Sequence, residues 1–142
     1  MIVIDSSAII AVRAEEPGWE ILVARLSDES PTQRYISAAT FLEAGTVIAG
    51  RSSNPEIAPK IMDDFLAKHS LEIVPVDAEQ ARIALQARIR LGRGFGHPAK
   101  LNFGDCFSYA LAKTLKAPLL YVGDDFDKTD VKSALRRKRK TR

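Results

Sequence analysis

The sequence predicts an α/β domain of three layers, with helices on both faces of a central, mainly parallel sheet. Short apolar runs rich in β-branched residues alternate along the chain with segments of helical periodicity. Such alternation is typical of β-α-β units joined by right-handed crossovers. A chain of 142 residues with 46% apolar and 27% charged residues fits one hydrophobic core. We therefore expect a single domain over residues 1–135, followed by a basic tail at 136–142.

Four apolar runs predict the strands of this sheet. They are residues 1–4 (MIVI), 34–36 (RYI), 71–76 (LEIVPV) and 118–122 (PLLYV). Parallel sheets in such domains are covered on both faces, so we expect each of these strands to be buried.

Apolar residues at helical spacing lie between the strands. Pro17, residues 51–55 and the glycine-rich residues 92–98 interrupt these patterns and predict turns. We expect the apolar stripes to face the core, although they would also suit a protein interface. The stripes are Trp19, Leu22, Val23 and Leu26, then Ala58, Met62 and Phe65, and then Ala81, Ala84 and Leu85.

Basic residues are segregated along the chain, although the net charge is only +3. Residues 81–104 contain five basic residues and no acidic one, and residues 136–142 (RRKRKTR) contain six and no acidic one. Such a tail is either a solvated terminus that aids solubility or an arm that binds phosphates. Bases that flank an acidic region suit a polyanion whose phosphates contact Lys and Arg while carboxylates hold a metal.

The single cysteine, Cys106, cannot form an internal disulfide, as expected in a reducing compartment. The apolar N-terminal run is interrupted at Asp5, and no apolar run approaches the length needed to cross a bilayer. We expect a cytoplasmic protein that does not enter a membrane.

Acidic residues follow the first and last predicted strands. Asp5 comes directly after residues 1–4, and Asp124 and Asp125 come after the last strand and one glycine. Glu43 and Asp105 each lie about one turn into a predicted helix. Because ligands gather at the carboxyl ends of parallel strands, we expect these carboxylates to meet at one edge of the sheet.

Each of these acids also has a local structural explanation. Asp5 has the position of a helix N-cap, and the last acidic pair suits a turn. Thr40 with Glu43, and Asn102 with Asp105, have the spacing of a capping box. A lone carboxylate next to a buried strand, as at Asp5, is nevertheless costly unless a cation or strong donors compensate it.

The acids taken together favour a metal site. Several carboxylates within a few Å of one another repel and take up protons unless a divalent cation compensates their charge. Ligands that are all oxygen atoms favour Mg²⁺ or Mn²⁺ over zinc, and such ions suit phosphoryl chemistry. Ser7, two residues after Asp5, either caps a helix or hydrogen-bonds a carboxylate or a water on the metal.

Four stretches of the chain form a known combination. They are MIVIDSSAI, FLEAGTV, HPAKLNFGDCFSYALAK and PLLYVGDDFDKTDV. Together they resemble the PIN-domain ribonucleases of the VapC toxin type, over nearly the whole chain except the basic tail. The resemblance implies a PIN-like fold with a central parallel sheet, and an endoribonuclease that depends on Mg²⁺ or Mn²⁺. It also implies the role of toxin in a type II toxin–antitoxin pair, with a VapB-type antitoxin and a second copy of the chain as partners.

The resemblance also assigns roles to individual residues. The first three catalytic and metal-binding acids fall on Asp5, Glu43 and Asp105. The fourth falls on Asp125 or, as second choice, on Asp124, because both fit the pattern G-[ND]-D-F. Lys and Arg bind phosphates without reading sequence, so the cations that precede the third acid are candidate RNA contacts. With the hydroxyl of Ser7, these candidates are Arg88, Arg90, Arg93 and Lys100.

Two other classes of protein are alternatives. In a non-catalytic RNA-binding module, the acids would form a structural cluster, while the tail and the glycine-rich loop would bind RNA. Other α/β phosphate enzymes agree less well with the sequence. A phosphatase of the haloacid dehalogenase type would need an aspartate at Ser7, and a receiver domain would need an acidic pair at Ser6 and Ser7.

Overall fold

The computed structural model describes residues 1–94 and 96–135, and the basic tail expected at 136–142 lies outside the described residues. Within those residues the sheet contains β1 (Ile2–Ile4), β2 (Arg34–Ser37), β3 (Glu72–Val74) and β4 (Leu119–Leu120). Their order is β3-β2-β1-β4, and all neighbouring strands are parallel. The positions of the strands and the parallel sheet confirm the prediction from the sequence.

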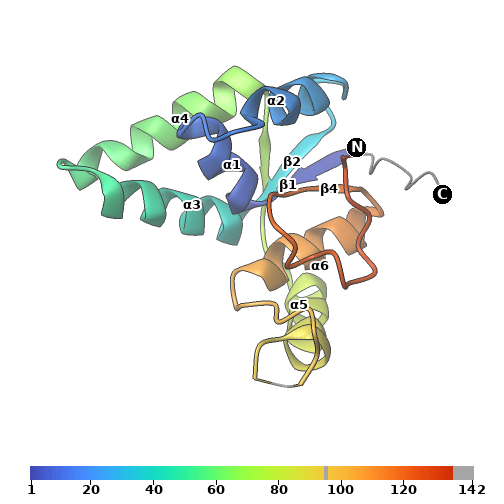
Figure 1. Cartoon of the computed structure of the whole chain (residues 1–142). Helices are drawn as coiled ribbons and strands as arrows, with labels where there is room; N and C mark the ends of the chain where they lie inside the picture. The colour runs from blue at the N-terminus through green and yellow to red at the C-terminus, as the bar shows by residue number, and fades with distance from the viewer. Residues whose placement is uncertain (95, 136–142) are drawn as a thin grey trace.

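Helices cover both faces of the sheet (Figure 1). One layer contains α1 (Ser6–Arg13), α2 (Trp19–Ser27), α3 (Ala38–Arg51), the short 3-10 helix η1 (Pro55–Ile57) and α4 (Ala58–His69). The other contains α5 (Ala78–Leu91) and α6 (Asp105–Leu115). Successive residues of β1 point to opposite layers, because Ile2 and Ile4 join the first core and Val3 joins the second. The three-layer α/β/α architecture is therefore confirmed.

Two details of the strands differ from the prediction. The expectation that every strand is buried is wrong for β3, where Glu72 and Ile73 are exposed because this strand lies at the edge and pairs only with β2. The last strand is also shorter than predicted. Its ladder with β1 ends at Leu120, and the Val122 amide donates instead to Ser7 Oγ (3.0 Å), at the start of α1.

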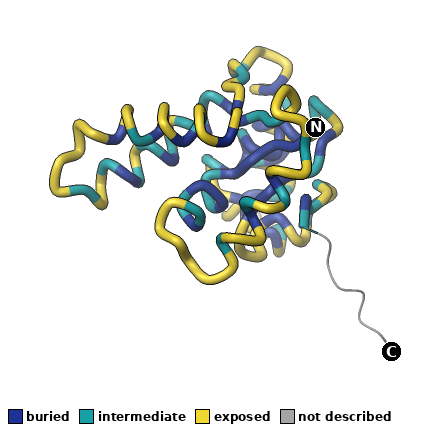
Figure 2. Tube along the Cα trace, turned by 90° about the horizontal axis from the view of Figure 1, so that it is seen from above, coloured by how far each residue is buried: buried dark blue, intermediate teal, exposed yellow. Residues whose placement is uncertain are grey.

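The apolar stripes of α2 and α4 face the core, as expected, but the expectation is wrong for most of the α5 stripe, where Ala81 and Leu85 are exposed and only Ala84 is buried. Leu22 and Leu26 of α2 are buried, as are Met62 and Phe65 of α4. Figure 2 shows that burial is concentrated around the sheet, whereas the pair formed by α3 and α4 extends beyond it. None of the helices in the described ranges is long and apolar enough to cross a membrane.

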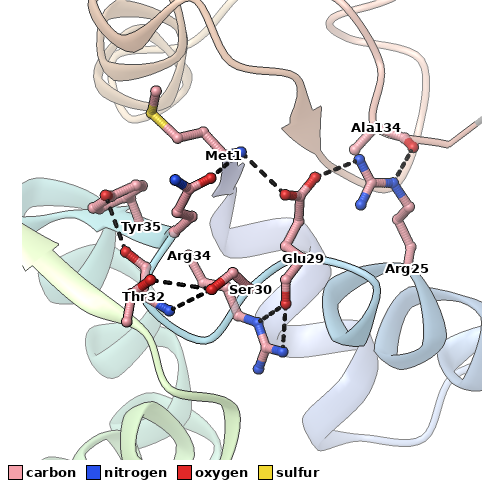
Figure 3. A network of polar contacts seen from close by, with 9 residues as sticks. Met1, Arg25, Glu29, Ser30, Thr32, Arg34, Tyr35 and Ala134 are labelled. Atoms are coloured by element: carbon pink, nitrogen blue, oxygen red, sulfur yellow. Dashed lines mark hydrogen bonds and ion pairs between the residues drawn. The ribbon is translucent and has the colours of Figure 1, made fainter.

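A polar network ties the segment after α2 to the rest of the domain (Figure 3). Glu29 accepts hydrogen bonds from the Met1 ammonium (3.0 Å) and from Arg25 Nη2 (3.1 Å). Arg25 Nε donates to the Ala134 carbonyl (2.8 Å), and Arg34 Nη2 donates to the Glu29 carbonyl (2.7 Å). The network thus holds β1, β2 and residue 134 against α2.

Candidate active site

The strand order places Asp5 at the point where the topology of the sheet reverses. β2 and β3 extend the sheet on one side of β1, and β4 lies on the other side. The carboxyl ends of parallel strands at such a point border a crevice where ligands bind. The Asp5 amide donates to the Leu120 carbonyl (2.9 Å), so Asp5 stands where β1 and β4 end together.

Asp5 receives three hydrogen bonds. Its Oδ2 accepts from the Ser7 amide (3.1 Å) and from Ser7 Oγ (2.7 Å), while its Oδ1 accepts from Ser108 Oγ (2.6 Å). The bond from the Ser7 amide makes Asp5 the N-cap of α1, which confirms its local explanation. Since Asp5 is only 1% exposed, these donors replace the water that an exposed carboxylate would have. Ser7 therefore orients a carboxylate through both its amide and its hydroxyl.

A buried pair of hydroxyl groups links Asp5 to α3. Ser108 Oγ lies 3.0 Å from Thr40 Oγ1, and both residues are buried. Because the single hydroxyl hydrogen of Ser108 goes to Asp5, the Thr40 hydroxyl is the donor in this pair. The hydrogen bonds from Thr40 to Ser108 and on to Asp5 therefore fix α3, α6 and the end of β1 relative to one another.

Asp105 begins α6, and reciprocal hydrogen bonds close the turn before it. The Asp105 amide donates to Asn102 Oδ1 (2.9 Å), and the Asn102 amide donates to Asp105 Oδ2 (3.1 Å). The capping-box explanation of Asp105 is therefore confirmed. Ser108 lies three residues further along α6, a spacing of about 5–6 Å between Cβ atoms, and it contacts Asp5. The two aspartates are thus neighbours at the same end of the sheet.

Glu43 reaches the same place from α3. Its capping-box explanation is wrong, because Ser37 caps α3 and Thr40 already lies inside the helix. Glu43 Oε1 accepts a hydrogen bond from Ser6 Oγ. A Cβ added to Gly104 would lie 1.4 Å from Glu43 Oε2, so the carboxylate lies directly against the backbone before α6. Figure 1 shows the N-terminal part of α3 beside the start of α6.

The carboxylates raise one another's pKa. The pKa of Asp105 is raised to about 7, mainly by burial and further by nearby negative charges, while the hydrogen bond from the Asn102 amide lowers it. These charges belong to Asp5, Asp125 and Glu43. Burial also raises the pKa of Glu43, opposed by the serine hydroxyl that donates to it, and the charge of Asp5 adds to the rise. Acids from four segments therefore share one electrostatic environment.

The two candidates for the fourth acid differ in their electrostatic effect on the other acids. Both are exposed in the loop after β4. Asp125 is among the charges that act on Asp105, whereas Asp124 is not among those that act on Asp105 or Glu43. We therefore group Asp125 with Asp5, Glu43 and Asp105, and these four residues are called the acidic cluster.

The candidate RNA contacts have different surroundings. The charge of Arg88 acts on the thiol beside Asp105, whereas that of Arg90 acts on a tyrosine further along α6. Arg88 Nη1 also donates to the Arg93 carbonyl (2.8 Å) and so closes the loop after α5. Arg90, Arg93 and Lys100 are exposed. The side chains of Arg90, Arg93 and Lys100 are therefore accessible to a phosphate backbone.

Sequence reasoning missed the roles of four residues: Ser6, Thr40, Gly104 and Ser108. Ser108 lies three residues after Asp105, and Thr40 three residues before Glu43, so helical spacing already placed each near an acid. Gly104 gave no such signal, because its role depends on a carboxylate from another helix. The same holds for Ser6, whose partner is Glu43.

The oxygens of the acidic cluster do not surround a common point. Within the ranges that the structure describes, no group of three or more His, Cys, Asp and Glu side chains has the geometry of a metal site. Asp5 and Glu43 direct oxygens toward serine hydroxyls, and Asp105 directs one toward an amide. The cluster is thus held by donors of the protein itself.

Comparison with known proteins identifies the family. The family model for the PIN domain matches residues 2–132, so the chain is a PIN-domain protein. Ribonuclease VapC42 of Mycobacterium tuberculosis is 42% identical over 132 residues, which cover 93% of this chain and 98% of the relative. Within the PIN-domain family, the chain therefore belongs to the VapC ribonucleases. The resemblance based on the four sequence stretches is confirmed.

Solved structures agree on the fold. VapC20 of Mycobacterium tuberculosis, a toxin that cleaves the sarcin-ricin loop, superposes with a TM-score of 0.71 at 16% identity, over 92% of this chain and 96% of that one. VapBC2 from Rickettsia felis, bound to a DNA fragment from its promoter, gives 0.67 at 17% identity, over 94% and 96%. The predicted PIN-like fold is therefore confirmed.

Proposed function

We propose that this protein is an endoribonuclease that depends on Mg²⁺, with Mn²⁺ as an alternative, and that it acts as the toxin of a type II toxin–antitoxin pair. The observation that carries the proposal is the convergence of Asp5, Glu43, Asp105 and Asp125 from four separate segments. Membership of the VapC ribonucleases supports the same activity.

The donor chemistry of the acidic cluster suits a hard divalent cation, although the described side chains are not arranged around a common point in this structure. Its ligand atoms are carboxylate oxygens, which Mg²⁺ and Mn²⁺ prefer. The raised pKa values of Asp105 and Glu43 indicate that positive charge would stabilise the cluster. Asp5, Glu43 and Asp105 would hold the ion, with Asp125 reaching it from the loop. When bound, such an ion supplies an activated water and neutralises charge on the leaving oxygen.

The three buried or half-buried acids differ in their freedom to move. Asp5 is fixed by three hydrogen bonds and provides a rigid ligand. Asp105 uses Oδ2 in the capping box, which leaves Oδ1 for a ligand. Glu43 depends on one serine hydroxyl, so it can rotate toward the two aspartates at the loss of a single hydrogen bond.

Mapping of cleavage ends on total RNA tests the activity. The wild type and Asp5→Asn are each incubated with and without Mg²⁺. Asparagine preserves the N-cap of α1, so the variant removes the charge while keeping the fold. Asp77→Asn is the matched control, because Asp77 caps α5 by accepting from the Gln80 amide (2.8 Å) and lies outside the acidic cluster.

We expect new RNA ends only with the wild type and the Asp77→Asn control, and only in the presence of Mg²⁺. Identical fragments in all lanes would contradict the proposal and would favour a non-catalytic RNA-binding module. Titration of Mg²⁺ by calorimetry supplies a second readout, in which Asp5→Asn should lose affinity for the ion.

We further propose that a VapB-type antitoxin is the partner. An apolar groove of about 380 Å³ lies between α3 and α4, and Phe41, Leu42, Ala49 and Met62 contribute to its lining. Leu42 is 69% exposed and adjoins Glu43, so an inhibitor seated in the groove would lie beside the acidic cluster. Ala49→Asp should weaken the complex with the purified antitoxin and leave RNA cleavage intact. Equal affinity of the variant and the wild type would contradict this location.

A homodimer in the cytoplasm completes the proposal. Membership of the VapC ribonucleases supports both, and the buried free thiol of Cys106 suits a reducing compartment. Light scattering on the purified protein should give the mass of two chains. The mass of one chain at micromolar concentration would contradict the dimer.

A further inference from the structure

We infer that Phe103 is a stacking platform for one base of single-stranded RNA, next to the acidic cluster. The inference rests on the proposed function and specifies one part of the RNA substrate that the protein binds. Among the large apolar side chains of the described residues, Phe103 is the most exposed, at 72%. It is separated from Asp105 by Gly104 alone.

The ring of Phe103 is presented by a turn that hydrogen bonds close on both sides. Asn102 and Asp105, on either side of it, are joined by the reciprocal hydrogen bonds of the capping box. Phe107 contacts the ring edge to face, with 5.0 Å between the centroids and 83° between the planes. Such a contact uses at most one face of the Phe103 ring. The exposed fraction leaves the other face in solvent, and a ring that is already held loses little entropy when a ligand stacks on it.

The position of the ring favours a base that belongs to the substrate. The Glu43 carboxylate lies against Gly104, the residue next to Phe103. A base stacked on Phe103 would therefore place an adjoining phosphodiester close to the acidic cluster. An aromatic ring binds the π-face of any base without reading its identity, so the platform sets the strand in place and leaves sequence preference to other contacts.

The charge around the ring favours a nucleic acid over an apolar peptide. Residues 81–104, which end at the turn, contain five cations and no acid, and the exposed Lys100 precedes Phe103 by three residues. Single-stranded RNA has both unstacked bases, which can stack on the ring, and phosphates, which can bind the cations. In a duplex the faces of the bases are covered by their neighbours. The platform therefore selects single-stranded or loop RNA.

The test measures binding without cleavage. Short single-stranded RNAs that carry 2-aminopurine at successive positions are titrated into Asp5→Asn protein, which keeps the turn intact. Fluorescence should be quenched when the base analogue occupies the platform, and this quenching should disappear in Asp5→Asn with Phe103→Ala. The Kd should rise about 5- to 150-fold, as expected for the loss of one stacked base.

Matched variants distinguish stacking from apolar contact. Phe103→Tyr should restore quenching and affinity, whereas Phe103→Leu, which is apolar but not aromatic, should not. Ile21→Ala is the control for removal of an exposed apolar side chain, since Ile21 lies on α2 and is 62% exposed. In otherwise wild-type protein, Phe103→Ala should raise KM for a single-stranded RNA and leave kcat nearly unchanged.

Three outcomes would overturn the inference. They are equal Kd and KM for Phe103→Ala and its parent, full rescue by Phe103→Leu, and a loss of antitoxin binding with no change in RNA binding. The last result would make the ring part of a protein interface. A wild type that binds the RNAs with quenching but cleaves none would contradict the proposed function and still support the platform.

Discussion

A missing side chain at Gly104 sets the geometry of the acidic cluster. The backbone of Gly104 is helical (φ −64°, ψ −39°), so glycine is not needed for its conformation. It is needed for space, because a Cβ would lie 1.4 Å from Glu43 Oε2. We expect Gly104→Ala to displace the Glu43 carboxylate and to slow RNA cleavage about 100-fold, as small displacements of catalytic groups do. Cleavage rates on a defined single-stranded RNA measure the effect.

Stability should hardly change in this variant. The atom displaced is the end of a flexible side chain, so the free energy of unfolding should change by less than about 1 kcal/mol in urea denaturation. Gly50→Ala is the control, because Gly50 lies on α3 with no atom within 4 Å of an added Cβ. If Gly104→Ala cleaved RNA at the wild-type rate, Glu43 would tolerate the displacement. The close packing of Glu43 against Gly104 would then not be needed for activity.

Asp105 gives the metal-free protein a predictable dependence on pH. Its pKa is about 7 in the folded state, against an ordinary value of 3.8. A carboxyl whose pKa is raised by folding contributes stability that is complete below its unfolded pKa and is lost as the pH rises through its folded pKa. We therefore expect stability to fall between about pH 4 and pH 7, and Asp105→Asn to flatten this profile in urea denaturation. If stability depended on pH in Asp105→Asn as it does in the wild type, groups other than Asp105 would cause the dependence.

At the scale of elements, two hydroxyl groups join α3 to α6. Ser108→Ala would leave Asp5 Oδ1 and the Thr40 hydroxyl each without this partner, at about 1–3 kcal/mol of stability. Thr40→Val removes only the donor to Ser108. Because the two residues share one hydrogen bond, the double variant should cost less than the sum of the single ones, with a coupling energy of about 0.5–3 kcal/mol. Strictly additive free energies of unfolding would contradict this network.

At the scale of the whole molecule, the proposed RNA substrate carries many negative charges, and the cations before α6 are the candidates to bind them. We expect RNA binding by Asp5→Asn protein to weaken with salt, and the slope of log K against log salt to fall by about 0.7 for each phosphate contact removed. Arg93→Gln and Lys100→Gln should each reduce the slope, since both side chains are exposed. Arg51→Gln, at the end of α3, is the control. Slopes equal to that of the parent would contradict the placement of RNA on this loop.

Local patterns explain which parts of the fold were predictable. The strands follow from short apolar runs, and the buried stripes of α2 and α4 follow from helical spacing. The burial of β3 was predicted wrongly, because an apolar run does not say whether a strand has a neighbour on both sides. The capping box predicted for Thr40 and Glu43 was also wrong. Ser37 is the actual N-cap of α3 and lies about one turn before Thr40, so the helix begins earlier than this spacing implied.

The sequence by itself determined the α/β class, the acids at the ends of the strands and the family, because periodicity and motifs depend on residues that are close along the chain. Only the tertiary structure decided which acids meet. It brought Asp125 close enough for its charge to act on Asp105, and it placed Gly104 against Glu43. The hydrogen bond from Ser108 to Asp5 joins residues 103 positions apart. Contacts of this kind depend on how distant segments pack, so no local pattern could have specified them.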